Sequence, residues 1–424
     1  MFRESSHGLC NTSPWKLDGR TPGLERCLGF LQGSMGIEVG CSPAGSCRCR
    51  QGVLQLGLLS PYGQRIRHTW KCSRNSVINH LEHFQKKSTG KRCEMNQEGN
   101  GFNPPRQSLP PFSRVIVSGG THGNELAGLY LVKQWLQGKA RGLQRQTFSA
   151  KAVLSNPRAS EVCRRYVDID LNRCFTTERL NSPDADDMPY EIHRAKELNV
   201  LLGPKGSEQA VDFICDLHNT TSNMGVSVLV YQDCHCFNLH MFKYIQSHMK
   251  SAPVYCGIFN TPKDQAYSVD SAAKHGIGLE VGPQPHGVLR ADILSHMAEA
   301  LKLVLDFIDL YNQGTEFPSC EVEVYVKDKD FDFPKDPVTG ELTATIHPER
   351  QDQDFQVMNP GDPLFQTFDG KTVNYSGSQP TYPFFINEAA YYEKNVAFSS
   401  SNKVSIRIPA LRLQASAGGA NRIS

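Results

Sequence analysis

The spacing of apolar residues changes twice along this chain of 424 residues. Up to residue 110 the chain has no sustained periodicity and is interrupted by Gly, Pro and Ser, with one short apolar run at Val53–Leu59. Such a segment has few groups able to bury a core. We therefore expect residues 1–110 to be a disordered extension or one foreign to the fold, and Met95, which opens a flexible leader, to be the natural start of the domain.

From Arg114 onward, β-rich runs alternate with segments of helical spacing. The first run, Val115–Val117, ends in two glycines and is followed by a helical pattern from Leu126 to Leu136. Further strands are expected at Ala152–Leu154, Val211–Leu217, Val226–Tyr231 and Ile277–Val281, and helices at Tyr190–Leu202, Phe237–Met249 and Val288–Tyr311. Alternating strands and helices predict an α/β sheet covered on both faces, which we assign to residues 111–314.

The pattern changes again after residue 314. Short β-rich runs separated by turn residues follow, at Val322–Val326, Leu342–Ile346, Thr372–Tyr375 and Val404–Ile408. This pattern predicts a smaller, mostly β domain at residues 315–412. The small and polar residues 413–424 are expected to form a flexible tail.

Composition narrows the classes of function. The net charge is +2, but residues 1–94 hold 14 Lys and Arg against 6 Asp and Glu, so the remaining chain is mildly acidic, and nucleic acid is not the expected partner. No apolar run approaches the length of a membrane span. Seven of the fourteen cysteines lie after residue 94, and these seven show no metal-finger spacing. Free thiols in the cytoplasm are the preferred interpretation, with peripheral attachment to the plasma membrane as an alternative.

A candidate metal site follows the first expected strand. His122 and Glu125 stand three residues apart in Gly-Gly-Thr-His-Gly-Asn-Glu, where glycines let the loop fold tightly around an ion. His218, at the end of an apolar strand, is the candidate third ligand. Two histidines and one carboxylate leave zinc an open fourth position, as in catalytic sites. This spacing also arises by chance, so on its own it does not separate a zinc site from structural histidines.

Longer motifs point to one family. The runs GGTHGNE, YVDIDLNR, DLHNTTSNMG, GLEVGPQPHGVLRADI and FINEAAYYEK occur in this order between about Arg114 and Phe398. They resemble the aspartoacylase family of zinc amidohydrolases, which are related in fold to zinc carboxypeptidases. The resemblance implies a carboxypeptidase-like mixed sheet covered by helices, one Zn²⁺ per chain, and His122, Glu125 and His218 as its ligands.

The resemblance also implies roles for residues beside the metal. Glu280, at the end of an expected strand, corresponds to the base that takes a proton from the attacking water and returns it to the leaving amine. Arg165 corresponds to the cation beside the developing oxyanion. Asn172 and Arg173 correspond to the pair that holds the substrate's α-carboxylate, and we expect Asp168 and Asp170 to support the arginines.

The smaller domain is expected to cap the site. Tyr391, in Asn-Glu-Ala-Ala-Tyr-Tyr-Glu-Lys, corresponds to a family tyrosine that reaches the substrate, whereas Glu388 is interpreted as structural. A cap that narrows the entrance would exclude long peptides. Exclusion of peptides would distinguish an acylase from a carboxypeptidase, and a carboxypeptidase remains an alternative function.

One position bears on which acyl amino acid is cleaved. Aspartoacylases carry an arginine for the substrate's side-chain carboxylate shortly before the strand of the base, and here Asp270 or Ser271 stands at its approximate place. Because Asp270 would repel an anion, we expect a neutral side chain to be preferred. The runs TFSAKAVLSNP, NQGTEFP and IRIPALRL resemble the branch of the family that accepts N-acetyl aromatic amino acids and mercapturates, and this resemblance implies those substrates. Lys263 could supply a cation instead, so cleavage of N-acetyl-L-aspartate stays open.

Other interpretations of the sequence are weaker. A zinc-containing, non-catalytic sensor of acyl amino acids is an alternative of another class, which the presence of Glu280 and Arg165 argues against. Cys234-His235-Cys236 is expected to form a loop and the start of a helix rather than a metal site. The basic pairs at residues 86–92 are expected to form a solvated surface. Small N-acyl amino acids are the expected partners, with assembly into a homo-oligomer.

Overall fold

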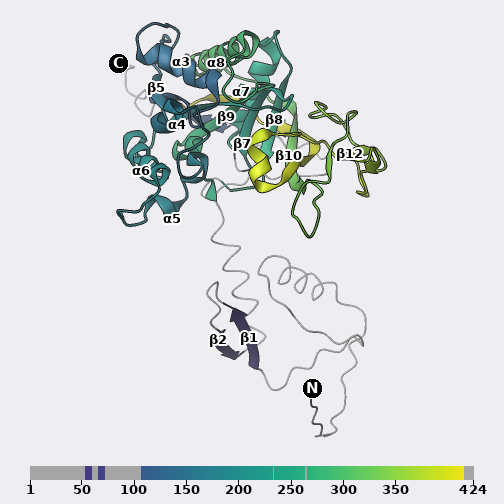
Figure 1. Cartoon of the computed structure of the whole chain (residues 1–424). Helices are drawn as coiled ribbons and strands as arrows, with labels where there is room; N and C mark the ends of the chain where they lie inside the picture. Colours follow the sequence, from purple (N-terminus) through teal and green to yellow (C-terminus); the bar gives the residue numbers. More distant parts are fainter. Residues whose placement is uncertain (1–52, 60–64, 72–106, 233, 263–264, 415–424) are drawn as a thin grey trace, which may run out of the picture. The chain divides into compact units, whose positions relative to one another are not determined.

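The computed structural model describes residues 53–59, 65–71, 107–232, 234–262 and 265–414. The chain divides into two compact units, Met1–Arg92 and Cys93–Ser424. In the first unit, strands β1 (Val53–Leu59) and β2 (Arg65–Lys71) pair antiparallel (Figure 1). The other residues of the expected extension up to residue 106, including the basic pairs at 86–92, lie outside the described residues.

An eight-stranded sheet forms the centre of the second unit, with strand order β14-β10-β8-β7-β9-β6-β4-β5. The strands are β4 (Val115–Gly119), β5 (Lys151–Leu154), β6 (Phe213–Asn219), β7 (Gly225–Tyr231), β8 (Val254–Phe259), β9 (His275–Gly282), β10 (Cys320–Asp332) and β14 (Val396–Ile408). Strands β5, β4, β6 and β9 run parallel to one another, and β7 is antiparallel to β9. The carboxyl ends of β4, β6 and β9 therefore meet at one edge, where α/β proteins commonly bind ligands.

Helices cover both faces of this sheet. They are α3 (Leu126–Leu136), α4 (Pro157–Glu161), α5 (Thr177–Leu180), α6 (Tyr190–Leu202), α7 (Cys236–His248) and α8 (Ala291–Asn312), with 3₁₀ turns η1 (Leu171–Arg173), η3 (Val269–Ala272) and η4 (Ala389–Lys394). Helices α3, α7 and α8 pack on one face (Figure 1). In α8, buried Ile293, Met297, Leu301 and Ile308 recur at spacings of four or seven residues, which is the apolar stripe of a helix that lies on a core.

The opposite face of the sheet carries the chemistry. Side chains alternate along a strand, and Leu217, Val228 and Leu279 lie in the core under α3, α7 and α8. Their neighbours His218, Leu229 and Glu280 must therefore project from the other face. There, α6 and η3 cover β4 and β6 through a second apolar cluster, and aromatic residues near the C-terminus pack on the β7 and β8 side.

The C-terminal segment differs in part from the expected separate domain. A small antiparallel sheet is present, with β11 (Ala344–Ile346), β12 (Pro363–Thr367) and β13 (Thr372–Asn374), and it has its own apolar cluster. The long strands β10 and β14, however, extend the main sheet, because β10 pairs parallel with β8. Alternation of apolar residues shows that a strand forms but does not identify its partner.

The folded unit also includes residues close to both expected boundaries. Strand β3 (Gln107–Leu109) pairs in parallel with β15 (Leu411–Leu413), although residues 107–110 were assigned to the extension. The Tyr311 hydroxyl ties this pair to α8, since it donates to the Leu109 carbonyl at 2.7 Å. Residues 415–424 of the expected tail lie outside the described part. Within the described residues, every helix is too short or too polar to cross a bilayer.

Candidate active site

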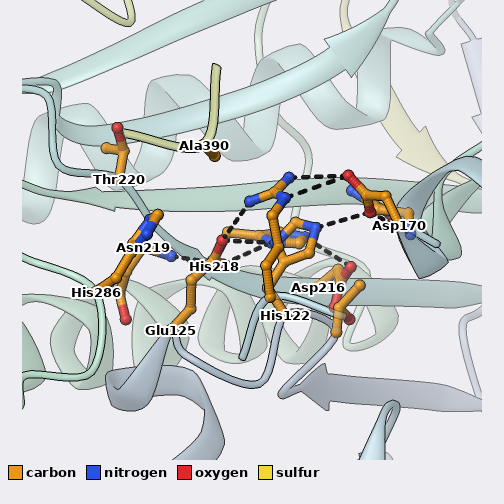
Figure 2. Close-up of polar contacts among 12 residues, drawn as sticks. His122, Glu125, Asp170, Asp216, His218, Asn219, Thr220, His286 and Ala390 are labelled. Carbon is orange, nitrogen blue, oxygen red and sulfur yellow. Dashed lines mark hydrogen bonds and ion pairs between the residues drawn. The ribbon is translucent and has the colours of Figure 1, made fainter. Parts of the chain in front are cut away.

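Three side chains converge at the carboxyl edge of β4 and β6. His122 Nδ1 lies 2.6 Å from Glu125 Oε1, and His218 Nδ1 lies 3.0 Å from Glu125 Oε2 and 3.2 Å from His122 Nδ1. All three side chains are buried, and Figure 2 shows them pointing toward one another. In the described part of the chain, this is the one group of three His, Cys, Asp or Glu residues with ligand atoms within 4.8 Å of one another.

Local backbone geometry explains why the loop after β4 can place two of these groups. Gly120 has φ +66°, a conformation that favours glycine. A Cβ atom on Gly123 would lie 2.2 Å from the Ala159 carbonyl oxygen, so only glycine allows the loop to pack against α4. His122 and Glu125 are thus held three residues apart on a tight loop that leads into α3.

The second ring nitrogen of each histidine is held by a carboxylate. His122 Nε2 lies 3.1 Å from Asp170 Oδ1, and His218 Nε2 lies 2.7 Å from Asp216 Oδ2 (Figure 2). Asp216 also accepts hydrogen bonds from the Ser118 and Thr121 hydroxyls at 2.6 and 2.8 Å. Asp216 is not among the site residues predicted from the sequence, although its position two residues before His218 places both side chains on the same face of β6.

This arrangement fits a metal ion. Asp170 and Asp216 favour a proton on each Nε2, which leaves both Nδ1 lone pairs directed at one point beside Glu125. Two lone pairs and a carboxylate at about 3 Å repel each other unless a cation lies between them. The donor set of two imidazoles and one carboxylate, with a carboxylate behind each imidazole, matches catalytic zinc sites.

Electrostatics around the cluster follows from burial and close pairing. Burial alone would raise the pKa of Glu125, but His122 and His218 hold it well below its usual value. Burial likewise opposes the charged form of His218, yet Asp216 and Glu125 raise the pKa of this imidazole well above its usual value. The two shifts favour opposite charges on this carboxylate and this imidazole, which attract each other.

The register of β6 and β9 places Glu280 next to the cluster. It is the partner of His218 across the parallel strands β6 and β9, and it is 8% exposed. Burial, together with the nearby Glu125, raises the pKa of Glu280 to about 8. A cation bound at the cluster would lower the pKa of Glu280. A buried carboxyl of this kind is suited to take up and return a proton.

The predicted cationic residues lie on the same side of the sheet. Arg165 Nη1 lies 3.2 Å from Glu125 Oε1, and its Nη2 lies 3.1 Å from Asp170 Oδ2. Burial lowers the pKa of Arg165, but Asp170 and Glu125 outweigh it and keep the pKa above its usual value. Asp170 therefore supports both Arg165 and His122.

The expected role of Asp168 is wrong. Its carboxylate accepts a hydrogen bond from the backbone N–H of Tyr190 at 2.7 Å, and so satisfies an amide in the first turn of α6. Carboxylates near helix N-termini are stabilised by these unpaired amides. Three arginines lie near Asp168 along the sequence, so the sequence favoured them, rather than the Tyr190 amide, as its partners.

Asn172 and Arg173 are fixed by contacts that leave donors for a ligand. Asn172 Oδ1 accepts from the Val269 N–H at 3.0 Å, so its Nδ2 is the remaining donor group. The Arg173 guanidinium lies 4.7 Å from the centroid of the Tyr267 ring and donates one hydrogen bond to the Asn172 carbonyl. The other guanidinium N–H groups suit a planar carboxylate.

One cavity of about 210 Å³ unites these groups. Its polar lining contains the predicted site residues His122, Arg165, Asn172, Arg173, His218, Glu280 and Tyr391. Its apolar lining contains Leu229, Phe259, Tyr267, Phe385 and Val396. Glu125 is behind the cavity surface, in contact with the histidines. The aromatic residues Phe259, Tyr267 and Phe385 were not predicted from the sequence, because they come from three separate segments.

Comparison with known proteins extends these observations. Residues 111–308 match the model of the succinylglutamate desuccinylase/aspartoacylase catalytic domain, and residues 320–403 match that family's barrel-sandwich hybrid domain. A rat N-acyl-aromatic-L-amino acid amidohydrolase (carboxylate-forming) is 51% identical over 304 residues, covering 72% of this chain and 95% of its own length. The human enzyme of that name is 50% identical over 308 residues, 72% of this chain and 96% of its own length.

This chain belongs to the succinylglutamate desuccinylase/aspartoacylase family. A zebrafish aspartoacylase is 47% identical over 306 residues, covering 72% of this chain and 96% of its own length. The crystal structure of murine aminoacylase 3 covers 72% of this chain and 100% of its own, with 48% identity and a TM-score of 0.70. The α/β sheet with a smaller C-terminal domain, predicted from the sequence, is therefore the architecture of this family.

In this family member, Glu388 joins the C-terminal segment to the strand of the metal site. Its Oε2 accepts from the Thr220 hydroxyl and from the Thr221 N–H at 2.8 Å, and its Oε1 accepts from the Ala390 N–H at 3.0 Å. These bonds hold η4, which carries Tyr391, against the loop after β6. The structural interpretation of Glu388 agrees with these contacts.

Two further sequence features can be located. Asp270 lies in η3, is 6% exposed and lines the cavity, whereas Lys263, the alternative cation, lies outside the described residues. His235 caps α7 by accepting from the Phe237 N–H at 3.1 Å, and Cys236 begins that helix. The expectation of a loop and helix start at Cys234-His235-Cys236 is confirmed. Cys163, Cys174, Cys215, Cys256 and Cys320 are free thiols.

Proposed function

We propose that this protein is a zinc-dependent amidohydrolase that releases the acyl group, as a carboxylate, from N-acyl aromatic amino acids and from mercapturates. The observation that carries this proposal is the composition of one cavity. It joins the His122, Glu125 and His218 cluster and Glu280 to the cationic side chains of Arg165 and Arg173 and to several aromatic side chains. The relatives named for N-acyl-aromatic substrates support it.

Each group has a part in this reaction. His122, Glu125 and His218 would hold the zinc ion, one per chain. When bound, the ion activates a water molecule and polarises the amide carbonyl. Glu280 takes the proton of the attacking water and delivers it to the leaving amine. Arg165 stabilises the negative charge that develops on the carbonyl oxygen.

The remaining residues orient the substrate. Arg173 and the Asn172 amide bind the α-carboxylate, and Tyr391, whose ring centroid lies 5.2 Å from that of Phe385, closes the cavity from η4. Leu229, Phe259 and Phe385 then offer apolar surface to the substrate's side chain. A homo-oligomer, a cytoplasmic location and attachment at the plasma membrane stay predictions.

Cleavage of N-acetyl-L-aspartate is the second candidate, because aspartoacylases are also close relatives. It requires a cation for the second carboxylate. Lys327 lines the cavity but lies 2.7 Å from Asp330. Lys394 lines the same cavity, with its ammonium 5.7 Å from the centroid of the Tyr391 ring. Asp270, a buried acid in the cavity wall, disfavours the anionic side chain.

The decisive test is acetate release by purified, zinc-loaded protein. N-acetyl-L-tyrosine and the S-benzyl mercapturate should be cleaved with at least about tenfold higher kcat/KM than N-acetyl-L-aspartate, a difference of about 1.4 kcal/mol. The opposite ranking would identify an aspartoacylase. Binding of these compounds without acetate release would identify a sensor, and release of C-terminal residues from peptides a carboxypeptidase.

A further inference from the structure

A second cavity lies directly behind the wall of the first. Its volume is about 170 Å³, and its lining includes His235, Asn238 and Ser271. Tyr231 and Asp270 line both cavities, so these two residues form a wall between the two spaces. Apart from Asp270, no residue of the second cavity has a part in the proposed function.

The wall is closed by a directed chain of hydrogen bonds. Ser268 Oγ donates to Asp270 Oδ1 at 2.5 Å. Because this uses the single proton of the serine hydroxyl, the bond between Ser268 and the Tyr231 hydroxyl must have the tyrosine as donor. The ring of Tyr231, at the end of β7, is thereby fixed to η3, which carries Asp270.

Sheet register places the base Glu280 and this wall along one floor of the cavity. Gly278 on β9 lies between the base Glu280 and the wall, and its partner across the sheet is Leu229. Leu229 and Tyr231 are two residues apart on β7, hence on the same face, and Tyr231 is the partner of Phe259 on β8. The floor of the cavity therefore leads from Glu280 past Gly278 and Leu229 to Tyr231.

Gly278 leaves this floor open. A Cβ atom added there would meet only the Leu229 Cβ, at 3.6 Å, which is an ordinary contact. The backbone of Gly278 does not have the positive φ that would itself require glycine. The missing side chain thus creates room beside the base, in the direction of Tyr231.

From this geometry we propose that Tyr231 is a specificity-determining residue, which limits the length of the substrate's side chain and shuts off the second cavity. The inference rests on the proposed function and specifies its substrate class. A side chain with one ring fits in front of Tyr231, and a second ring in line collides with it. The second cavity would accept that ring if the tyrosine were shortened. Asn238 Oδ1, buried there without a hydrogen-bond partner among the described residues, would suit a terminal hydroxyl.

The test compares two substrates that differ by one ring, N-acetyl-L-phenylalanine and N-acetyl-4-phenyl-L-phenylalanine. We expect Tyr231→Ala to raise the ratio of kcat/KM for the longer over the shorter substrate by at least about tenfold, which is about 1.4 kcal/mol. Tyr231→Phe keeps the ring and should change the ratio by less than about twofold. Tyr130→Ala, which removes an exposed tyrosine on α3, is the matched control and should leave the ratio unchanged.

A second variant keeps the test valid if Tyr231→Ala does not fold. Tyr231→Leu retains apolar contacts on β7 but shortens the wall, and should also raise the ratio. An unchanged ratio in a folded Ala or Leu variant that retains zinc and cleaves N-acetyl-L-phenylalanine would overturn the proposal. A large rise in the Phe variant would mean that the hydrogen bond, rather than the ring, sets the limit.

Calorimetry separates this inference from the proposed function. The amino acids L-phenylalanine and 4-phenyl-L-phenylalanine can be titrated into the unmodified protein and into Tyr231→Ala. If Tyr231→Ala binds 4-phenyl-L-phenylalanine more tightly than the unmodified protein does, this would support Tyr231 as the residue that limits side-chain length, even if no acyl amino acid is cleaved. If the unmodified zinc-loaded protein cleaves no N-acyl amino acid, the proposed function fails, and the calorimetric comparison still decides the role of Tyr231.

Discussion

His218 on β6 and Glu280 on β9 are direct partners across two parallel strands, so a single register places a metal ligand beside the base. A shift of one residue on either strand would turn one of these side chains into the apolar core. Leu217 and Leu279, which precede them, fix this register because both are buried under the helices on the other face. The chemistry of the site therefore depends on ordinary apolar alternation in its strands.

Removal of His218 should abolish metal retention and hydrolysis, because two ligands hold zinc poorly. His218→Ala is expected to lose zinc on dialysis, as measured by elemental analysis. Asp216→Asn, which removes only the carboxylate behind the imidazole, should weaken zinc binding by about 10–100-fold. The surface histidine variant His193→Ala serves as control. Full zinc occupancy in His218→Ala would contradict the ligand assignment.

Replacement of Glu280 should separate metal binding from turnover. Glu280→Gln keeps the size of the side chain but cannot accept the water's proton, so kcat is expected to fall by about 10²–10⁴-fold at unchanged zinc content. Glu321→Gln, at an exposed position of β10, should behave like the unmodified protein. Substantial turnover by Glu280→Gln would assign the base to another group.

Loss of Glu388 should destabilise the fold more than it alters the chemistry. Glu388→Ala leaves the Thr221 and Ala390 amides and the Thr220 hydroxyl without their buried acceptor. We expect the free energy of unfolding to fall by about 2 kcal/mol or more. Denaturant unfolding measures this, with Glu349→Ala at an exposed position as control. An unchanged unfolding midpoint would mean that Glu388 does not anchor the C-terminal segment.

Two truncations should behave differently. Deletion of residues 1–94 removes the first compact unit and should leave folding and activity intact. Deletion of residues 1–110 also removes β3, and with it the pairing to β15 and the hydrogen bond from Tyr311, so this shorter chain should melt at a lower temperature. Inactive or insoluble 95–424 protein, with active full-length protein, would show that the first unit is needed.

The sequence predicts the site better than its surroundings. Strand ends and motifs predict that His122, Glu125, His218 and Glu280 meet, because parallel strands bring their carboxyl ends to one edge. The alternation in β6 could also have revealed Asp216. The partner of Asp168 could not be predicted, since it is a backbone amide twenty-two residues away. The wall at Tyr231 could not be predicted either, because it depends on the packing of η3 against the end of β7.

Asp270 should make the preference among substrates depend on pH. Burial, with a further contribution from Asp216, raises the pKa of Asp270 to about 6, despite the hydrogen bond from Ser268 that lowers it. The carboxyl group is therefore charged at pH 7.5 and mostly neutral at pH 5.5. Repulsion of an anionic side chain should weaken as the pH falls, while N-acetyl-L-aspartate itself keeps its charge over this range.

We expect the ratio of kcat/KM for N-acetyl-L-tyrosine over N-acetyl-L-aspartate to decrease from pH 7.5 to pH 5.5. Both substrates in one reaction share the titration of Glu280, which cancels in this ratio. Asp270→Asn should give a lower ratio that no longer varies with pH, and Asp270→Arg should narrow the gap further by adding a cation. A ratio that is constant with pH in the unmodified enzyme and unaltered in Asp270→Asn would show that this carboxylate does not face the substrate's side chain, and that the aromatic lining alone selects it.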